Sequence, residues 1–577
     1  MPNWTEQQKT VISSKSNKII CSAAAGSGKT AVMIERVIRL IRDGADPETF
    51  LIMTFTNAAA SEMKQKIRDR LREERKDSRL RAAYEKLDLM EICTIHSFCQ
   101  HLIRQEFQAA AVDPFFAVCE QARGKKLFAE AFRSACGALQ KAGDPDYAYW
   151  KTCFRQKESE DIVRSVYGFM MSLPDPCDWL DRSCDNVPEK PDDSHPWFAE
   201  ASEIVREKIR MAGTILNYQF RMFDEPECGE AYRAVWKADR ELFHVKQLWA
   251  DGQEVPEEQL KAGFMRLPSW TKLNSLEQNW KERYTAYRDQ LKGLMAEINP
   301  LVRPDPETVA RDFGNLKRAL RGLKVLTHRT REAYDAKKAK LRLLDFNDLE
   351  QRALKVLRSE PAGSSVRDRY TEVVVDECQD VSRVQDEIIQ LLSSEKGRLF
   401  MVGDVKQSIY RFRLADPGCF QDRADEYDRP ESGGELLKLQ TNFRSRPEIL
   451  ETANTVFRDI MRKDTAEMDY TREEELIPGL PAEGYHPVQV DLLQPDPSRT
   501  ALETAADDVA ARARELLEEK KNEEGNFHFR DMVILLPRVS REGPELARLL
   551  RSGESPSSST GVWISMSGRR SPLSWPC

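Results

Sequence analysis

The stretch "SAAAGSGKT" at residues 22–30 decides the fold of the first part of the chain. It ends in G-S-G-K-T, as in the phosphate-binding pattern G-x-x-x-x-G-K-[ST], although Ala23 stands at the first glycine position. The apolar run Ile19, Ile20 and Cys21 precedes it, and "AVMIERVIRLI" at 31–41 follows with apolar residues at helical spacing. A strand before the loop and a helix after it are the context that this pattern requires, and an accidental glycine-rich turn is the alternative.

The chemistry of this loop follows from its backbone. N–H groups in a glycine-rich turn can donate to phosphate oxygens, and the helix N-terminus adds partial positive charge. Lys29 would reach the β- and γ-phosphates, and the Thr30 hydroxyl would bind Mg²⁺. Alanine is small enough for position 23 unless the backbone there needs a positive φ. The predicted nucleotide-binding residues of the loop are Ala23, Ala24, Ala25, Gly26, Ser27, Gly28, Lys29 and Thr30.

Composition limits the class of protein. The chain has 577 residues, of which 32% are charged and 40% hydrophobic, which predicts a soluble globular protein of about three or four domains. The net charge of −7 gives no global signature of nucleic-acid binding, so any such site must be local. We expect no membrane span, no signal peptide and a cytoplasmic location. The 12 cysteines are scattered without C-x-x-C pairs and predict reduced thiols.

Strand and helix patterns alternate in two parts of the chain. The first ends near residue 117, the second begins near 336, and strands joined by helical crossovers predict a parallel sheet. Residues 118–335 between them are long, charged and helical, and a further α/β segment begins near 421. Seven of the ten tryptophans lie between 150 and 280, where core packing is preferred over base-stacking platforms.

Two carboxylates end the apolar run "YTEVVVDECQD" at 370–380. Its three valines predict a buried strand, and ligands bind at the carboxyl ends of strands in open α/β sheets. Asp376 can hold Mg²⁺ through water, and Glu377 can orient or deprotonate an attacking water. Such a pair is common on surfaces but not at the end of an apolar strand in a chain with a phosphate-binding loop.

A polar and aromatic segment, "VGDVKQSIYRFR" at 402–413, follows another predicted strand. Gln407 can hydrogen-bond the γ-phosphate or the attacking water. Tyr410, Phe412 and Arg413 combine aromatic and cationic side chains, which suits stacking on the bases of a single strand. Packing between domains is the alternative for these three side chains.

"TNFRSRPEIL" at 441–450 supplies Arg444 from the next α/β segment. An arginine that approaches the γ-phosphate from a second domain stabilises charge in the transition state. A surface salt bridge is the alternative.

The order of these stretches resembles the motifs of superfamily 1 DNA helicases of the UvrD/PcrA/RecB type. "SAAAGSGKTAV" and "GDVKQSIYRFRLADPGCF" are most similar to the A subunits of bacterial AddAB helicase–nucleases. The resemblance covers residues 4 to about 545 and is most specific in the motifs. They are "TEQQKTVI", "AAAGSGKT", "TFTNAAASEM", "TIHSFC", "LDFNDLE", "VVVDECQD", "VGDVKQSIYRFRLADPGCF" and "QTNFRSRPEIL".

The resemblance implies a site for ATP and Mg²⁺. Gln8 matches the glutamine that reads adenine, and Lys29 and Thr30 match the lysine and threonine of the phosphate loop. Asp376 and Glu377 match the metal-binding and catalytic carboxylates. The aromatic residue that relatives commonly carry after the glutamate is here a cysteine, for which we expect little effect.

The resemblance also implies roles at the γ-phosphate and on DNA. Gln407 matches the phosphate-sensing glutamine, and Arg444 matches the second-domain arginine. Phe412 takes the place where many relatives have a stacking tryptophan. The residues expected to contact nucleic acid are Phe55, Thr56, Asn57, His96, Tyr410, Phe412 and Arg413.

The fold that the resemblance implies is an α/β RecA-like P-loop core with a parallel sheet, a large helical insertion and a second, incomplete RecA-like domain. The expected partners are single-stranded DNA, duplex ends and a second subunit of the AddB type. The expected boundaries are 1–117 with 336–420 for the first RecA-like domain, 118–335 for the insertion, 421–552 for the second domain and 553–577 for an aberrant tail.

Three functions stay open: a DNA-stimulated ATPase motor, a P-loop ATPase that does not use nucleic acid, and a fragment that binds ATP or DNA without turnover. The last arises from the tail "ESPSSSTGVWISMSGRRSPLSWPC", which lacks periodicity and suggests a shifted frame or truncated gene after about residue 552, with a natural short isoform as the alternative. We expect the late helicase motifs and the nuclease domain to be missing, and unwinding to be negligible.

Overall fold

The computed structural model divides the chain into two compact units. One comprises residues 1–445 and 460–480, and the other residues 446–459 and 481–577. The described part of the chain runs from residue 4 to residue 552, and the predicted aberrant tail lies outside it. Within these limits the residues not described are 75, 192–193, 270–272, 303–305, 394–396, 467, 482–483, 485–486, 495–497 and 525–526.

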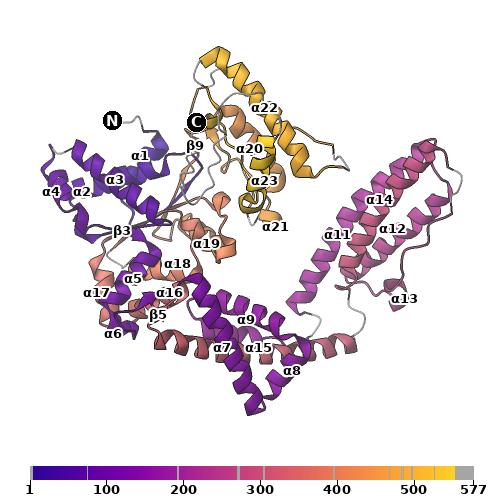
Figure 1. The fold of residues 1–577 in the computed structure, drawn as a ribbon, viewed down its shortest axis with the longest axis horizontal. Helices are drawn as coiled ribbons and strands as arrows, with labels where there is room; N and C mark the ends of the chain where they lie inside the picture. The colour runs from indigo at the N-terminus through magenta and orange to yellow at the C-terminus, as the bar shows by residue number, and fades with distance from the viewer. Residues whose placement is uncertain are drawn as a thin grey trace. The chain divides into compact units, whose positions relative to one another are not determined.

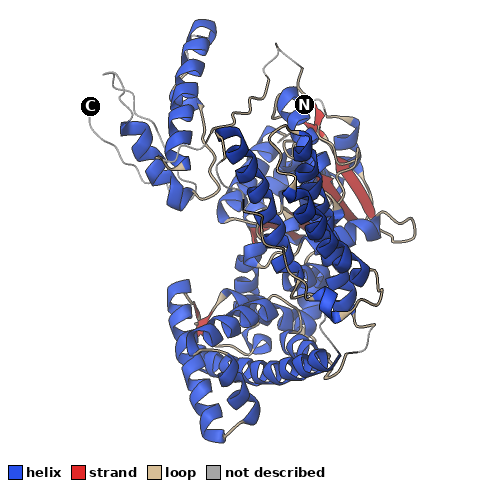
Figure 2. Ribbon diagram, turned by 90° about the vertical axis from the view of Figure 1, so that its right-hand side faces the viewer, coloured by secondary structure: helices blue, strands red, loops and turns tan. Residues whose placement is uncertain are grey.

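The first unit is built on a parallel sheet of six strands, ordered β3-β2-β6-β7-β1-β8. Figure 2 draws the strands in red. Every neighbouring pair runs parallel, as the crossover pattern predicts, and the α/β fold class is confirmed. The phosphate-binding stretch follows β1, near one edge of the sheet. The strands are β1 (Lys18–Ala23), β2 (Phe50–Thr54), β3 (Glu91–Thr94), β6 (Glu372–Val375), β7 (Arg398–Gly403) and β8 (Glu435–Leu439).

Helices cover both faces of this sheet because strand side chains alternate between the two cores. In β1, Ile20 packs into one core while Ile19 and Cys21 pack into the other. The Ile20 face is covered by α5 (Ile95–Gln105), α6 (Phe107–Ala110), α16 (Phe346–Arg358), α17 (Ala362–Arg369), α18 (Arg383–Leu392) and α19 (Pro417–Tyr427). The opposite face is covered by α1 (Glu6–Ser13), α2 (Lys29–Asp43), α3 (Asn57–Glu73) and α4 (Ser78–Glu85).

The helical insertion leaves and rejoins the core through a short parallel pair, β4 (Ala117–Val118) and β5 (Leu343–Leu344). One bundle, α7 (Gln121–Ala142), α8 (Pro145–Cys153), α9 (Gln156–Met171), α10 (Pro176–Asp185) and α15 (Pro306–Lys340), has its own apolar core. Figure 1 also shows the long helices of a second bundle, α11 (Pro196–Arg221), α12 (Ala231–Ala250) and α14 (Ser275–Ile298), with the short α13 (Glu257–Leu260). Of its four described tryptophans, Trp236 and Trp280 are buried in the core as predicted, whereas Trp249 is half-buried and Trp197 is 50% exposed.

Strand β8 comes from the segment that the sequence assigns to the second domain, yet it pairs with β1 as the sixth strand of the first sheet. The next residues form β9 (Thr441–Asn442), which pairs with β10 (Ile477–Pro478) in the same unit, where α21 (Lys463–Ala466) also lies. The domain boundaries therefore stay a prediction, and the strand pairing extends the first sheet to Leu439.

The second unit contains α20 (Pro447–Ile460) for most of its length, α22 (Ala501–Glu524) and α23 (Val539–Ser552). In the sequence, "FRDMVILLP" at 529–537 predicts a strand and "ELARLLRSG" at 545–553 predicts a helix. The helix is confirmed by α23, but the strand is wrong. A single 3-10 turn, Phe529–Asp531, opens that stretch, and no described residue pairs with the rest of it. An apolar run alone does not make a strand, because a strand needs a neighbour for its backbone hydrogen bonds.

Candidate functional site

The loop between β1 and α2 has the backbone of a phosphate cradle. Gly26 and Gly28 have φ values of +69° and +83°, and Gly28 is the N-cap of α2. Ala23 is the last residue of β1, paired with Leu439, and it is not among the described residues with positive φ. The first glycine of the pattern is therefore not required here, because an extended strand residue tolerates a methyl group.

Neighbouring segments hold three consecutive loop carbonyls, those of residues 25–27. The N–H of Ser27 donates to the carbonyl of Ala24 at 3.2 Å, but no described residue accepts from the N–H of Gly26 or Gly28, so these two groups remain for a ligand. The hydroxyl of Ser27 is buried without a partner among the described residues, as expected of a group that awaits one. The donors are Nδ2 of Asn442 to Ala25 (2.7 Å), N–H of Phe443 to Gly26 (2.9 Å) and Nε2 of Gln8 to Ser27 (3.0 Å).

Gln8 belongs to α1 and uses both ends of its amide. Its Oε1 accepts from the N–H of Thr5 at 3.0 Å, which completes a capping box, while its Nε2 donates to Ser27. A primary amide has a second N–H and a second lone pair, so the predicted contact with adenine is compatible with these bonds. The sequence did not single out the neighbouring Gln7, whose amide bonds Gln440 at the same edge.

The lysine of the loop meets the predicted catalytic carboxylate. Lys29 Nζ lies 3.2 Å from Oε2 of Glu377, and Glu377 has a left-handed backbone, with φ +52°. Asp376 lies directly after β6, and its N–H donates to the carbonyl of Met53 at 2.9 Å. Burial and the adjacent Glu377 carboxylate raise the pKa of Asp376 to about 6, although Lys29 opposes this rise. A divalent cation at this position would relieve the buried charge.

Two polar residues that sequence reasoning missed connect these carboxylates to Gln407. Gln379 donates through Nε2 to Glu377 at 2.8 Å and accepts through Oε1 from the N–H of Asp404 at 3.0 Å. Asp404 is buried and accepts from Nε2 of Gln407 at 2.6 Å. Only the signal "DECQD", a glutamine two residues after the glutamate, could have pointed to Gln379.

Lys406 is a further buried charge beside Gln407. Its Nζ lies 3.0 Å from Oδ1 of Asp404 and 2.7 Å from Oε2 of Glu474. Because two carboxylates flank it, the pKa of Lys406 is raised despite the desolvation that opposes the charged form. Glu474 is far away in the sequence, so the motif alone could not reveal this cluster.

The structure places Arg444 beside the phosphate loop. A Cβ on Gly26 would lie 2.8 Å from Cβ of Arg444. The Arg444 side chain is exposed, and no described carboxylate pairs with its guanidinium. The surface salt bridge considered from the sequence is therefore absent from the described residues. Lys29, Asp376, Glu377 and Arg444 thus surround one end of the sheet.

An aromatic group projects from two strand ends on the same side of the sheet. The rings of Phe55 and Tyr410 lie 4.5 Å apart, and those of Tyr410 and Phe412 lie 5.7 Å apart. The guanidinium of Arg413 lies 5.2 Å and 5.7 Å from the last two ring centres. Phe412 is 77% exposed, so its ring is open to a ligand.

Thr56 and Asn57 follow Phe55 at the start of α3. Thr56 is the N-cap of α3, and its hydroxyl accepts from the N–H of Ala59 at 3.1 Å. Asn57 is the first helical residue. The Thr56 hydroxyl thus bonds the third N–H of the helix, one of the N–H groups that have no partner within it.

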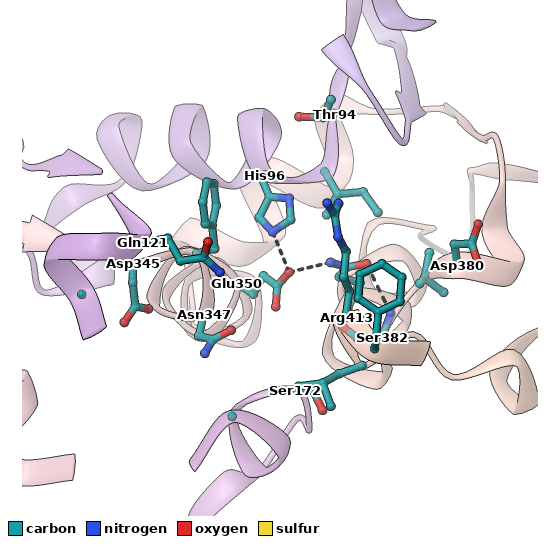
Figure 3. Close-up of a pocket in the computed structure, with 18 of the residues that line it drawn as sticks. Thr94, His96, Gln121, Ser172, Asp345, Asn347, Glu350, Asp380, Ser382 and Arg413 are labelled. Atoms are coloured by element: carbon teal, nitrogen blue, oxygen red, sulfur yellow. Dashed lines mark hydrogen bonds and ion pairs between the residues drawn. The ribbon is translucent and has the colours of Figure 1, made fainter. Parts of the chain in front are cut away.

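His96 lies in the same cleft, on α5 (Figure 3). Its Nε2 is 3.1 Å from Oε1 of Glu350, which is buried and also accepts from Gln385, and its ring meets Phe346 edge-on at 5.0 Å. The cleft measures about 780 Å³, and it is lined by residues predicted to be catalytic and by residues predicted to bind nucleic acid. The predicted site residues that line it are Phe55, His96, Asp376, Glu377, Phe412 and Arg413.

Other classes of site receive no support from the described residues. No cluster of three histidine, cysteine or acidic side chains is arranged to hold a metal ion there, and every described cysteine is unpaired. Among the helices that the structure describes, none combines the length and apolar character needed to cross a bilayer.

Comparison with known proteins shows which family and which proteins this chain is similar to. Residues 4–428 match the UvrD/REP helicase N-terminal domain. A curated protein of Syntrophomonas wolfei, the A subunit of an ATP-dependent helicase/nuclease, is 32% identical over 83% of this chain and 40% of its own length. Proteins with the same description from Alkaliphilus metalliredigens and Staphylococcus carnosus are 31% and 30% identical over 93% and 92% of this chain. The chain spans less than half the length of these relatives.

Proposed function

The chain belongs to the UvrD/REP helicase family, and from this premise we propose that it binds ATP and couples its hydrolysis to movement on single-stranded DNA. One observation carries the proposal. The predicted catalytic carboxylates Asp376 and Glu377 and the aromatic residues Phe55 and Phe412 line one cleft. ATP hydrolysis and base binding would therefore take place in the same cleft, close enough for each to affect the other. This arrangement favours a motor over a P-loop ATPase that does not use nucleic acid.

In this proposal the phosphate loop binds the triphosphate through its N–H groups and Lys29. An arriving phosphate attracts the ammonium of Lys29, which in this structure contacts Glu377 at 3.2 Å. Glu377 is then free to orient the attacking water and accept its proton. Arg444 faces charge that develops on the γ-phosphoryl group, and Gln407 reports its presence.

The residues present also fit a magnesium ion. Thr30 follows the loop lysine, Asp376 is a half-buried carboxylate with a raised pKa, and the Ser27 hydroxyl is buried without a described partner. A bound Mg²⁺ would be held by Thr30 and Asp376 and would supply positive charge at the β- and γ-phosphates. A carboxylate that loses hydration on burial is the kind of ligand that such a cation stabilises.

On the nucleic-acid side, we propose that bases stack on Phe412 and Tyr410 while Arg413 holds a backbone phosphate. Thr56, Asn57 and His96 complete the contact surface. The Thr56 hydroxyl also caps α3, and His96 also pairs with Glu350. Aromatic faces accept any base, so the binding is sequence-tolerant.

The similarity to A subunits of helicase–nucleases supports a wider proposal. We place the chain in a cytoplasmic DNA repair and recombination complex with a second subunit of the AddB type, and with exonuclease activity in the full assembly. The domain boundaries at 117, 335 and 420 belong to the same proposal.

The direct test is nucleotide binding by the purified chain. Lys29→Ala should abolish Mg·ATP binding measured by calorimetry, because Lys29 is the loop cation that contacts phosphate. Lys15→Ala, which removes a lysine outside the loop, is the control. Equal affinity in the Lys29 variant and the parent would contradict the assignment of the loop. Hydrolysis that single-stranded DNA does not stimulate would favour an ATPase that does not use nucleic acid, and binding without turnover would favour the fragment.

A further inference from the structure

Asn442 is a buried amide, 2% exposed, that uses both ends of its side chain. Its Oδ1 accepts from the N–H groups of Arg444 and Ser445, each at 2.8 Å, and shapes the turn that carries Arg444. Its Nδ2 donates to the carbonyl of Ala25 in the phosphate loop at 2.7 Å. One side chain therefore connects the loop to the backbone of the predicted γ-phosphate arginine.

The loop and this turn are also in direct contact. The N–H of Phe443 donates to the carbonyl of Gly26 at 2.9 Å. A Cβ on Gly26 would lie 2.7 Å from Nδ2 of Asn442 and 2.8 Å from Cβ of Arg444, so the two backbones approach closely. The loop cannot change its conformation at Gly26 without moving Asn442, Arg444 or both.

The other side of Asn442 is held by the rest of the unit. It pairs with Pro478 in the β9–β10 ladder, and its carbonyl accepts from the N–H of Gly479 at 2.8 Å. The chain just before it is held too, because the carbonyl of Leu439 accepts from the N–H of Ala24 at 2.8 Å. Asn442 is thus located between a β-ladder and the loop, where a small change in either alters its bonds.

We propose that Asn442 is a positioning residue that keeps the Arg444 turn in register with the phosphate loop, so that phosphate in the loop sets the place of the arginine. This inference rests on the proposed ATPase function. The new element is the residue that couples the phosphate loop to Arg444. That residue is Asn442, whose amide does not itself touch nucleotide. If Asn442 only stabilised the fold, substitutions at residues 442 and 444 would lower the rate of ATP hydrolysis independently of each other.

Two variants separate the two ends of the amide. Asn442→Asp keeps an oxygen for the N–H groups of Arg444 and Ser445 but replaces the donor to Ala25 by a second oxygen. Asn442→Ala removes both. Gln440→Ala is the matched control, because Gln440 is a neighbouring amide that bonds Gln7 and the carbonyl of Glu473 but not the loop or Arg444.

The first measurement needs no nucleotide. Hydrogen exchange followed by mass spectrometry should show faster exchange in the loop, residues 23–31, for Asn442→Asp, with the turn at 443–446 still protected. Asn442→Ala should speed exchange in both segments, and Gln440→Ala in neither. Unchanged loop exchange in Asn442→Asp and Asn442→Ala would overturn the inference, whether or not the protein is an ATPase.

The second measurement is a double-mutant cycle on DNA-stimulated ATP hydrolysis. Asn442→Ala should lower kcat about tenfold, the size of one lost hydrogen bond, with Tm close to that of the parent. If Asn442 acts through Arg444, the double variant with Arg444→Ala should be no slower than Arg444→Ala alone. If the double variant is slower than Arg444→Ala by the factor that Asn442→Ala costs alone, the inference is overturned. A parent without ATPase activity would instead contradict the proposed function, and the exchange experiment would then decide the role of Asn442.

Discussion

Single residues in the sheet carry unusual ionisation. Glu372 opens β6, and its side chain is 5% exposed, with Arg398 at 3.4 Å. Burial raises the pKa of Glu372 from its ordinary value of 4.5 to about 7, although Arg398 and Arg36 oppose the rise. The folded state thus keeps a proton at a pH where the unfolded chain has lost it.

This difference predicts a pH dependence of stability. Between about pH 4.5 and pH 7 the folded state binds more protons than the unfolded chain, so the free energy of unfolding falls as pH rises through this window. The loss from Glu372 is at most about 3 kcal/mol. Glu372→Gln should remove this contribution. The free energy of unfolding of the variant, measured in urea, should therefore rise relative to that of the parent between pH 5.5 and 7.5.

The comparison with the parent is essential because Asp376 and Asp348 also have raised pKa values, near 6 and 7. Glu62→Gln is a control, since Lys66 lowers the pKa of the exposed Glu62 and its titration lies below this window. A difference between Glu372→Gln and the parent that does not change with pH would contradict the predicted linkage.

At the scale of elements, the short turns after β2 and β7 decide where aromatic rings stand. Phe55 follows β2, and Tyr410, Phe412 and Arg413 lie in the segment after β7 that ends in a 3-10 turn, Arg411–Arg413. Because β2 and β7 are parallel and separated only by β6, their carboxyl ends lie at the same edge of the sheet. The sheet topology therefore assembles the aromatic group from residues more than 350 positions apart.

Removing the exposed ring tests this group. Phe412→Ala should weaken binding of a fluorescent single-stranded oligonucleotide about tenfold, since stacking on one base contributes about 1–3 kcal/mol. The binding should also weaken steeply with salt. Phe115→Ala removes another exposed phenylalanine, one that does not line the cleft, and should leave binding unchanged. Equal binding by the Phe412 variant and the parent would show that the ring does not contact DNA.

At the scale of the whole molecule, the two units differ in how well they bury apolar side chains. The first unit has distinct cores on both faces of its sheet and in each insertion bundle. In the second unit, Val533 and Leu535 are 79% and 86% exposed, and Val490 and Leu492 are similarly open. Exposed runs of this kind favour association with other apolar surfaces.

This exposure predicts that the chain binds an apolar dye and self-associates. Replacing Val533 and Leu535 together by Asp should lower dye fluorescence and the rate of light scattering on warming, because it breaks one continuous apolar run. Leu276→Asp, at a single exposed leucine on α14, should change neither. Unchanged scattering in the double variant would show that this run does not drive association.

Elements with strong local signals could be predicted from the sequence alone. Glycine spacing, apolar runs and helical periodicity predicted β1, the phosphate loop, α2, and the strands that end just before Asp376 and Asp404, because these depend on neighbours within a few residues. The strand at 529–537 was wrong, since an apolar run cannot show whether a pairing partner exists.

Which distant groups meet depends on how the chain packs in three dimensions. It placed β8 in the first sheet, connected Gln379 and Asp404 between Glu377 and Gln407, and brought Asn442 onto the loop. These contacts join residues up to 417 positions apart, and those of Gln379, Asp404 and Asn442 depend on side-chain amides and carboxylates that have no periodic pattern. A local pattern specifies backbone conformation, whereas hydrogen bonds between segments arise only when packing and sheet order bring those segments within about 3 Å.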